Sequence, residues 1–375
     1  MRIGINAIFL VAGEGGGIER YLRGLLKGLA SMDKKNEYLV FGNRDNAGTF
    51  GLADNFREIV SPVSARVRPA KILWEQFVLP SQLKKEKVDV VLSVGNIAPK
   101  ISFCPSIVII YDLISFSHPE NFLLSERLAL RYLLHRTAKS ADRIITVSES
   151  SRNGIMKWLG VPEDKISVVY GGCDEDLRKH VIDVDRVKNR FGIKDRFIFC
   201  VASTRKYKNL DGLVKAYNIL KKKYDIAHKL VLAGHKDRYY EELQKIIKVS
   251  GLENVVIFTG FLQDDELLSL YSLADIFVYP SFYEGFGLPI LEAMASGTPV
   301  VVSNMTSIPE VVGDAGLLFD PHNIDEMAEK IYSAIKNKDL RKVLISKGFE
   351  RVKEFTWERT AEKVLGVINS VVKTG

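Results

Sequence analysis

The chain has 375 residues, of which 46% are hydrophobic and 26% are charged, so a largely disordered protein is excluded and two domains with sizeable cores are expected. A formal net charge of +7 favours anionic partners, which include nucleic acid, phosphorylated small molecules and acidic membrane surfaces. The three cysteines are widely spaced and odd in number, which excludes a disulfide framework and a paired zinc motif.

No apolar run of the sequence is long enough to cross a bilayer, and the short apolar stretch after Arg2 is better explained as a first strand than as a signal sequence. No recognition motif accompanies the positive charge, so nucleic acid is not an expected partner. We therefore expect a cytoplasmic protein whose contact with the inner face of the membrane, where it occurs, is peripheral.

The first half opens with a strand predicted over 3–10, a glycine-rich loop and a helix predicted over 18–31. The loop sequence GEGGG lacks the GxGxxG spacing of a dinucleotide-binding fingerprint. Gly16 and Gly17 at this turn are therefore only a weak signal of a ligand site.

After a second strand predicted over 37–42, the segment 61–87 is the most basic part of the first half and contains the apolar run ILWEQFVLPSQL. One interpretation is a peripheral membrane surface, formed by the basic segment 66–87. The other, which we favour because amphipathic helices usually face their own core, is a helix with a solvated edge, broken in two by Pro80. In that helix the buried residues would be Leu73, Trp74, Phe77 and Val78.

Two apolar runs, 88–93 and 106–111, are typical of buried parallel strands. In open α/β sheets ligands lie beyond the carboxyl ends of the strands, so Asn96, Tyr111 and Asp112 should face a cleft. His118 follows Asp112 by six positions and either enters the same site or is a surface-loop histidine.

The first half is completed by helices predicted over 125–138 and 151–159 and by strands over 142–147 and 166–170. The polar stretch 171–186 lacks apolar periodicity and is predicted to link two domains.

The second half begins with a strand predicted over 197–202, the basic segment STRKYKNL and a helix over 210–223. Arg205 and Lys208 in this segment are candidate counter-charges for a phosphate group, or else they are exposed loop residues. Further strands over 229–233 and 255–259 and a helix over 264–274 follow.

The stretch 274–302, ADIFVYPSFYEGFGLPILEAMASGTPVVV, predicts a strand, a glycine-rich turn, a short helix and a second strand. Gly285 and Gly287 permit unusual backbone conformations, and Pro289 suits the first turn of a helix. The free amides from Gly285 to Leu288 would then form the positive end of a helix, which is a site for a phosphate.

Two glutamates, Glu284 and Glu292, accompany this turn. Beside a diphosphate they could accept hydrogen bonds from ribose or sugar hydroxyls. Alternatively, Glu284 caps the helix and Glu292 is solvated, and spacing alone favours this simpler explanation.

The segment EGFGLPILEAMASGTPVV resembles the signature of the GT-B retaining glycosyltransferases of family four. The resemblance covers the full chain, more strongly in the second half, and implies an α/β protein with two Rossmann-like domains whose parallel sheets face a central cleft. It implies an acceptor domain over 1–175, completed by the C-terminal helix 357–375, and a donor domain over 176–356.

The resemblance also implies roles for individual residues, with no metal site. Gly16 and Gly17 would lie against donor phosphate or acceptor, although a merely tight turn remains the alternative. Tyr111 stands where the family commonly has histidine, and the family's arginine before Lys208 is not cleanly aligned with Arg205. Catalysis would depend on Glu284, Lys208, Arg205 and Asp112. The donor would be bound by Gly285, Phe286, Gly287, Leu288, Glu292, Phe261, Leu262, Gly16 and Gly17. The acceptor would be bound by Asn96, Tyr111 and His118.

The activity that this resemblance implies is metal-independent, retaining transfer of a hexose from a nucleotide-diphosphate sugar, with no other cofactor, to a saccharide or lipid-linked acceptor in polysaccharide biosynthesis. GDP-mannose is the favoured donor, because the KNL and HPENF segments are similar to bacterial polysaccharide mannosyltransferases. The alternatives are an epimerase or phosphorylase of the same fold and a nucleotide-sugar binder without activity.

Overall fold

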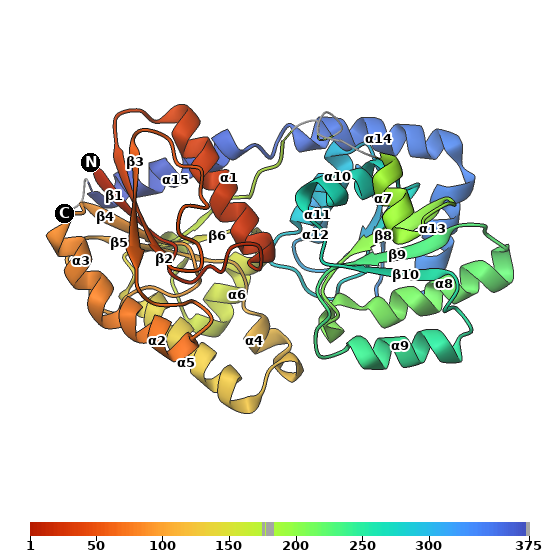
Figure 1. Ribbon diagram of the computed structural model, residues 1–375, viewed down its shortest axis with the longest axis horizontal. Coiled ribbons are helices and arrows are strands. Elements are labelled where there is room, and N and C mark those ends of the chain that lie inside the picture. Colours follow the sequence, from red (N-terminus) through yellow and green to blue (C-terminus); the bar gives the residue numbers. More distant parts are fainter. Residues whose placement is uncertain (175–176, 178–183, 373–375) are drawn as a thin grey trace. The chain divides into compact units, whose positions relative to one another are not determined.

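The computed structural model describes residues 1–174, 177 and 184–372, and the chain divides into two compact units. The first unit comprises Met1–Gly172 and Phe355–Gly375, and the second comprises Cys173–Glu354. The boundary predicted between residues 175 and 176, and half of the predicted linker 171–186, lie outside the described residues. Each unit is a parallel β-sheet flanked by helices (Figure 1).

The sheet of the first unit has seven parallel strands in the order β3-β2-β1-β4-β5-β6-β7. Its edge strand β3 was not predicted, because an edge strand is only partly covered and its sequence FREIVS has no continuous apolar run. The strands are β1 (Arg2–Asn6), β2 (Glu37–Asn43), β3 (Phe56–Ser61), β4 (Val90–Ser93), β5 (Ser106–Ile110), β6 (Arg143–Thr146) and β7 (Ile166–Val168).

Helices cover both faces of this sheet (Figure 1). One face packs against α3, α5 and α6 through Leu83, Leu134 and Ile155, and the other carries α1 and α15. The helical elements are α1 (Gly16–Met32), α2 (Arg68–Leu73), the π-helical turn η1 (Trp74–Val78), α3 (Leu79–Lys85), α4 (Ile114–Ser117), the 3₁₀ turn η2 (Pro119–Asn121), α5 (Leu124–Ser140), α6 (Glu149–Leu159), the 3₁₀ turn η3 (Glu163–Lys165) and α15 (Trp357–Val372).

The predicted burial of Leu73 and Phe77 is wrong, because these side chains are 58% and 73% exposed. The cause is the π-helical turn η1, in which the amide of Leu79 donates to the carbonyl of Trp74, five residues earlier. Pro80 has no N–H with which to continue an α-helical pattern. The wider turn changes which residues face the sheet, so Glu75 is buried.

The second unit has six parallel strands in the order β10-β9-β8-β11-β12-β13. One face packs against α8, α9 and α13 through Tyr217, Leu243 and Ile331. The strands are β8 (Phe197–Val201), β9 (Lys229–Ala233), β10 (Val256–Gly260), β11 (Ile276–Tyr279), β12 (Val300–Ser303) and β13 (Gly316–Phe319). The helical elements are α7 (Val184–Phe191), the 3₁₀ turn η5 (Lys206–Lys208), α8 (Leu210–Tyr224), α9 (Tyr240–Val249), α10 (Asp264–Leu273), α11 (Leu288–Ala295), α12 (Ile308–Val312), α13 (Ile324–Lys336) and α14 (Lys338–Val352).

The predicted fold class of two Rossmann-like α/β domains is confirmed. In both sheets the strand order reverses beside the unit's first strand, between β1 and β4 and between β8 and β11. Loops diverge at such a switch point and leave a crevice beyond the carboxyl ends of the strands, where ligands bind in this class of fold. Across the described ranges, no helix has the length and apolar character needed to span a membrane.

The two chain segments of the first unit are joined by a close contact between α1 and α15. A methyl group added at Gly24 would lie 2.1 Å from the Trp357 ring, and one added at Gly28 would lie 2.3 Å from the Trp357 carbonyl oxygen. The two glycines therefore allow α15 to approach the backbone of α1.

We expect Gly24→Ala to destabilise the protein by about 1–3 kcal/mol, because the overlap with Trp357 outweighs the gain in helix propensity. Gly366→Ala is the matched control, since nothing lies within 4 Å of the added methyl group on α15. It should be neutral or stabilise by up to about 1 kcal/mol. Urea unfolding measures both, and equal midpoints for the two variants would contradict the proposed close packing.

Candidate active site

An ion pair lies at the switch point of the second unit. Lys208 follows β8 on the turn η5, and Glu284 follows the neighbouring strand β11. The Lys208 Nζ lies 2.6 Å from Glu284 Oε1 and donates to the Tyr279 hydroxyl at 3.3 Å. The two charged side chains are only 12% and 10% exposed, so water screens their attraction weakly.

The neighbouring Glu284 keeps Lys208 protonated. Burial lowers the pKa of Lys208, but the charge of Glu284 more than compensates and holds that pKa well above its usual range. Burial and the charge of Glu284 raise the pKa of Tyr279 well above its usual value. At neutral pH the site therefore holds an ammonium group, a carboxylate and a neutral phenol within a few ångströms.

Asn209 fixes the position of Lys208. Its backbone adopts the left-handed conformation at a φ of 54°, and its side-chain amide donates to the carbonyl oxygens of Pro280 and Pro321 at 3.1 and 3.0 Å. These carbonyls follow β11 and β13, so one buried asparagine connects three loops at the same edge of the sheet.

The loop between β11 and α11 is held by two hydroxyl groups. The amide of Glu284 donates to Thr306 Oγ1 at 3.0 Å, and Ser307 Oγ donates to the carbonyls of Glu284 and Phe286 at 3.1 and 2.8 Å. Gly287 has a φ of 121°, which favours glycine, and α11 begins directly after it at Leu288. The positive end of α11 thus lies beside the Lys208–Glu284 pair. Thr306 was missed by sequence analysis because its contact is long-range.

The simpler explanations of the two glutamates are wrong. The N-cap of α11 is Gly287, without a side-chain cap, and Glu284 pairs with Lys208. Glu292 lies on α11 but is buried rather than solvated, and it accepts a hydrogen bond from the Tyr271 hydroxyl at 2.9 Å.

Arg205 lies near this site but has a different partner. Its Nε donates to Asp237 Oδ2 at 2.5 Å, and the Asp237 backbone amide is held by the Thr204 hydroxyl. Burial raises the pKa of Asp237, but the hydrogen bond and charge of Arg205 outweigh this, so the pKa lies below its usual range. Asp237 follows β9 and was not a predicted site residue, because nothing in the sequence near residue 237 indicates its pairing with Arg205.

The turn after β10 presents a flat ring. Phe261 is 44% exposed and stacks on His235, with ring centroids 4.5 Å apart, while Leu262 is buried. Beside these residues, the carboxyl ends of β8, β9 and β10 line a small pocket. Its lining includes Ala202, Thr204, Gly234, Lys236, Phe258 and Gly260.

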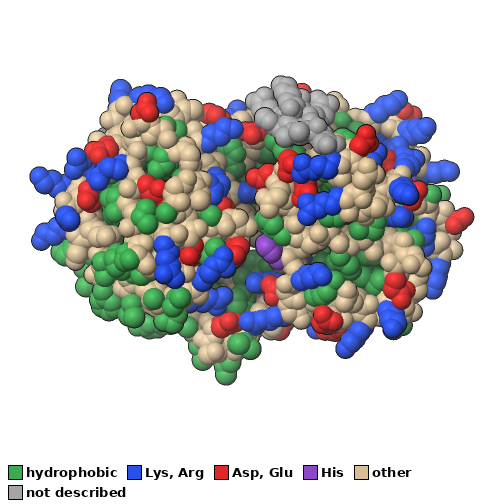
Figure 2. Space-filling view, in the orientation of Figure 1, with side chains coloured by type: hydrophobic (Ala, Val, Ile, Leu, Met, Phe, Trp, Pro, Cys, Tyr) green, Lys and Arg blue, Asp and Glu red, His purple; other side chains and the backbone are tan. Residues whose placement is uncertain are grey.

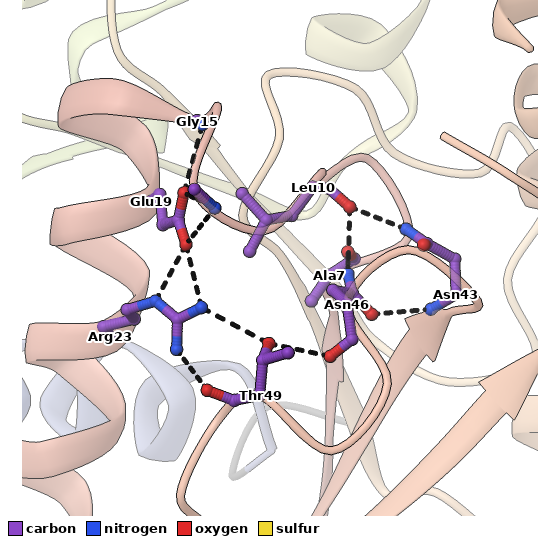
Figure 3. Close-up of polar contacts among 9 residues, drawn as sticks. Ala7, Leu10, Gly15, Glu19, Arg23, Asn43, Asn46 and Thr49 are labelled. Carbon is purple, nitrogen blue, oxygen red and sulfur yellow. Dashed lines mark hydrogen bonds and ion pairs between the residues drawn. The ribbon is translucent and has the colours of Figure 1, made fainter. Parts of the chain in front are cut away.

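In the first unit, the predicted glycine loop is organised by a carboxylate within the chain (Figure 3). Glu19 accepts hydrogen bonds from the amides of Gly13 and Gly15 at 3.0–3.1 Å and pairs with Arg23 at 2.8 Å. Gly16 has a φ of 53°, and neither Gly16 nor Gly17 has a neighbour that would block a side chain. A tight turn accounts for the conformation of Gly16, and contact with a donor remains a prediction for both glycines.

The predicted acceptor residues follow β4 and β5. Asn96 accepts from the Tyr111 amide at 2.8 Å and so ties the two strand ends together. The Tyr111 ring is buried edge-to-face against Tyr21, and its hydroxyl lies inside the unit without a hydrogen-bond partner. In this structure the Tyr111 phenol therefore does not reach a surface on which an acceptor could bind.

Asp112 and His118 flank the short helix α4. Asp112 accepts from the amide of Ile114 at 3.1 Å, and the His118 ring lies 3.1 Å from the Ser117 hydroxyl. Burial lowers the pKa of His118, although Glu120 opposes this shift. Both side chains are half-buried at the carboxyl end of β5.

A buried carboxyl group that the sequence did not indicate lies at the switch point of the first unit. Glu75, on the π-helical turn, accepts a hydrogen bond from Asn6 Nδ2 at 2.6 Å, and the same amide lies 3.3 Å from Ser93 Oγ. Asn6 and Ser93 are paired at the carboxyl ends of β1 and β4. Burial raises the pKa of Glu75 to about 7, although Asn6 and Lys71 oppose this shift.

Comparisons with known proteins identify the family of the chain. Residues 15–177 match the family described as Glycosyltransferase Family 4, and residues 181–351 match the family described as Glycosyl transferases group 1. The O-antigen chain mannosyltransferase B of Escherichia coli is 33% identical over 257 residues, which are 68% of this chain and 68% of that protein. The serotype-specific mannosyltransferase WbdA of Escherichia coli is 30% identical over 267 residues, but the match spans only 32% of that protein.

Solved structures show the same fold. The sucrose-phosphate synthase of Thermosynechococcus elongatus has a TM-score of 0.80 over 100% of both chains at 19% identity. WaaG, a glycosyltransferase involved in lipopolysaccharide biosynthesis, has a TM-score of 0.74 at 15% identity and covers 98% of this chain and 99% of its own. The chain belongs to the family 4, group 1 glycosyltransferases of the GT-B fold. Within the residues that the structure describes, no three His, Cys, Asp or Glu side chains form a metal-binding group.

The raised pKa of Glu75 predicts a pH-dependent stability. Glu75 holds its proton more tightly in the folded state than in the unfolded state. Its protonation therefore stabilises the folded state fully below about pH 4.3, and this stabilisation is lost as pH rises through about 7. Glu75→Gln removes this titration, and the melting temperature of the variant relative to the natural protein should therefore rise between pH 5 and pH 8. The control Glu362→Gln, at an exposed position of α15, should show no such trend. Parallel pH profiles for Glu75→Gln and the natural protein would contradict this assignment.

Proposed function

We propose that this glycosyltransferase moves a hexose from a nucleotide-diphosphate sugar to a saccharide or lipid-linked acceptor with retention of configuration, and that it needs neither a metal ion nor a cofactor. The observation that supports this best is the buried Lys208–Glu284 pair beside the start of α11. Names of the relatives, among them O-antigen mannosyltransferases, favour mannose as the sugar and polysaccharide biosynthesis as the setting.

The leaving diphosphate would occupy the space between Lys208 and the amides from Gly285 to Leu288. A fixed cation and a helix N-terminus stabilise the negative charge that develops on the leaving group, and they do so without reorganisation during the reaction. The role that a divalent ion plays in other transferases would thus fall to Lys208. Arg205 is a second cation for this purpose once it shares or releases Asp237.

Glu284 would orient the sugar. The Lys208 cation offsets the repulsion between the Glu284 carboxylate and a neighbouring diphosphate. The remaining lone pairs of the carboxylate can accept hydrogen bonds from sugar hydroxyls. Glu292, held by Tyr271, would accept from the ribose, and the stacked pair of Phe261 and His235 would offer a flat surface to the base.

The reaction forms a bond between an acceptor oxygen and the anomeric carbon and breaks the bond from that carbon to the diphosphate. In the retaining mode the acceptor attacks from the face that the diphosphate leaves, and the acceptor proton passes to the departing phosphate oxygen. No dedicated base is then required, and Asp112 of the first unit is the candidate for assisting the acceptor. Asn96 and His118 would contribute to its binding.

Removing either member of the ion pair should lower turnover. For Lys208→Ala and Glu284→Gln we expect kcat/KM with a nucleotide sugar to fall by well over tenfold, a loss of the size seen for groups that stabilise a transition-state charge. Lys206→Ala is the matched control, because this neighbouring lysine on η5 is exposed and lies over the Tyr239 ring instead. Acceptor-dependent release of the nucleoside diphosphate is the readout, with melting curves to verify folding. Activity close to that of the natural protein in both variants would refute the site assignment.

The donor base can be identified by ligand-induced stabilisation. A nucleotide that binds the folded protein at about 100 times its Kd raises stability by about 2.7 kcal/mol, so the matching member of a panel of GDP, UDP, ADP and dTDP should produce the largest shift in melting temperature. We expect this to be GDP. A larger shift with UDP would exclude GDP-mannose as the donor, and isomerised donor without acceptor-dependent release would favour an epimerase.

A further inference from the structure

Thr306 has a backbone conformation that threonine seldom adopts. The residue lies in the loop between β12 and α12, and its φ is 51°. A side chain that branches at Cβ makes a positive φ especially unfavourable. Elsewhere in the described part of the chain, a positive φ occurs at glycines and at four residues without a branched Cβ, which are Lys87, Asn96, Asn209 and Asp225. The strain at Thr306 is therefore unusual within this protein.

The turn that contains Thr306 would be satisfied by a glycine. The amide of Ile308 donates to the carbonyl of Met305 at 3.1 Å, which closes a four-residue turn with Thr306 and Ser307 at its centre. Ser307 has a φ of −82° and a ψ of −11°, so only the first central residue has a positive φ. This is the pattern of a type II′ turn, whose first central position favours glycine, asparagine and aspartate. The turn by itself therefore does not account for a threonine.

The Thr306 side chain makes a contact that a glycine would lack. Its Oγ1 accepts a hydrogen bond from the Glu284 amide at 3.0 Å, across 22 positions of the sequence. Ser307 Oγ donates to the Glu284 carbonyl at 3.1 Å. The two central residues of the turn thus hold both the N–H and the C=O of Glu284, whose carboxylate lies 2.6 Å from the Lys208 ammonium. The strained turn and the ion pair are parts of one arrangement.

The position of the Glu284 carboxylate matters because the ion pair is buried. Most charged side chains on the visible face of the second unit are spread over its surface (Figure 2), where water screens them and a small displacement changes their interactions little. Lys208 and Glu284 are shielded from water, so their attraction depends strongly on the distance between them. A backbone that holds Glu284 in place therefore has a direct effect on this pair.

The chemistry of threonine explains why the strain is retained. Stability alone would favour glycine at position 306, because glycine adopts a positive φ without steric cost. Asparagine tolerates this φ, but its acceptor oxygen lies one bond farther from the backbone. The branched Cβ of threonine restricts χ1 and so keeps the hydroxyl in a fixed direction. Strained residues persist where the surrounding structure holds them, and they are concentrated at functional sites.

We propose that Thr306 is a positioning residue for the transfer reaction, and that its hydroxyl fixes the backbone of Glu284, and with it the carboxylate, although the turn is strained. The inference rests on the function proposed above for Glu284. It implies that stability and turnover are opposed at position 306, because a residue that relieves the strain also loses the contact with Glu284.

Three variants at position 306 separate the two effects. Thr306→Gly and Thr306→Val both remove the hydroxyl, so kcat should fall about threefold to tenfold in each, as expected for one hydrogen bond, while KM for the nucleotide sugar changes much less. Thr306→Gly should melt at a higher temperature than Thr306→Val, because only glycine relieves the strain. Thr306→Ser keeps the oxygen and should restore most of the natural turnover. Acceptor-dependent release of the nucleoside diphosphate is the readout.

Asp225→Gly is the matched control. Asp225 also has a positive φ, of 45°, but it is exposed where α8 ends and the chain approaches the amino end of β9. Because Glu284 follows the carboxyl end of β11, the two positions lie at opposite edges of the sheet. The substitution relieves a positive φ without affecting Glu284, so kcat should equal that of the natural protein.

Natural kcat in either Thr306→Gly or Thr306→Val would overturn the positioning role, and so would a Thr306→Ser variant as slow as Thr306→Val. The variants of the ion pair keep this result separate from the proposed function. If Glu284→Gln and Lys208→Ala lose turnover while Thr306→Val does not, only the role of Thr306 is refuted. If Glu284→Gln and Lys208→Ala keep natural turnover, the site assignment fails and the role of Thr306 fails with it.

Discussion

The parallel arrangement of the strands is the constraint on which both candidate sites depend. Parallel strands present all their carboxyl ends at one edge of a sheet, and the reversal of strand order beside β1 and beside β8 leaves a crevice at that edge. In the second unit this constraint brings Lys208 and Glu284, 76 positions apart, within hydrogen-bond distance. In the first unit it places Asn6 and Ser93 side by side above the buried Glu75.

A buried ion pair by itself contributes little to stability, because the free-energy cost of removing two charges from water is about as large as the gain from their attraction. We therefore interpret the Lys208–Glu284 pair as two charges that the fold holds in place before a ligand binds. Asn209, Thr306 and Ser307 hold the loops on either side of it, and all three are held through carbonyl, amide or hydroxyl contacts rather than through the charges themselves. The surrounding loops would thus keep their conformation when a ligand changes the local charge.

The first unit is organised differently at the corresponding edge. Its glycine loop is held by the internal carboxylate of Glu19, and Tyr111 fills the interior against Tyr21. This edge therefore presents backbone and half-buried polar groups such as Asp112, in contrast to the compact ion pair of the second unit. The difference agrees with the weaker family resemblance of the first half of the sequence.

The sequence alone determined the order of most strands and helices and the fold class, and it indicated candidate residues for the donor side. Continuous apolar runs, glycine turns and the EGFGLPILE segment are patterns of neighbouring residues, so they can be recognised in the sequence itself. What the tertiary structure decided was every partnership between distant residues: Glu284 with Lys208, Arg205 with Asp237, Glu75 with Asn6. The tertiary structure also decided the exposure of Leu73 and Phe77, because a π-helical turn changed which residues of the segment face the sheet. This change depends on packing around Pro80, which the apolar periodicity of the sequence does not indicate.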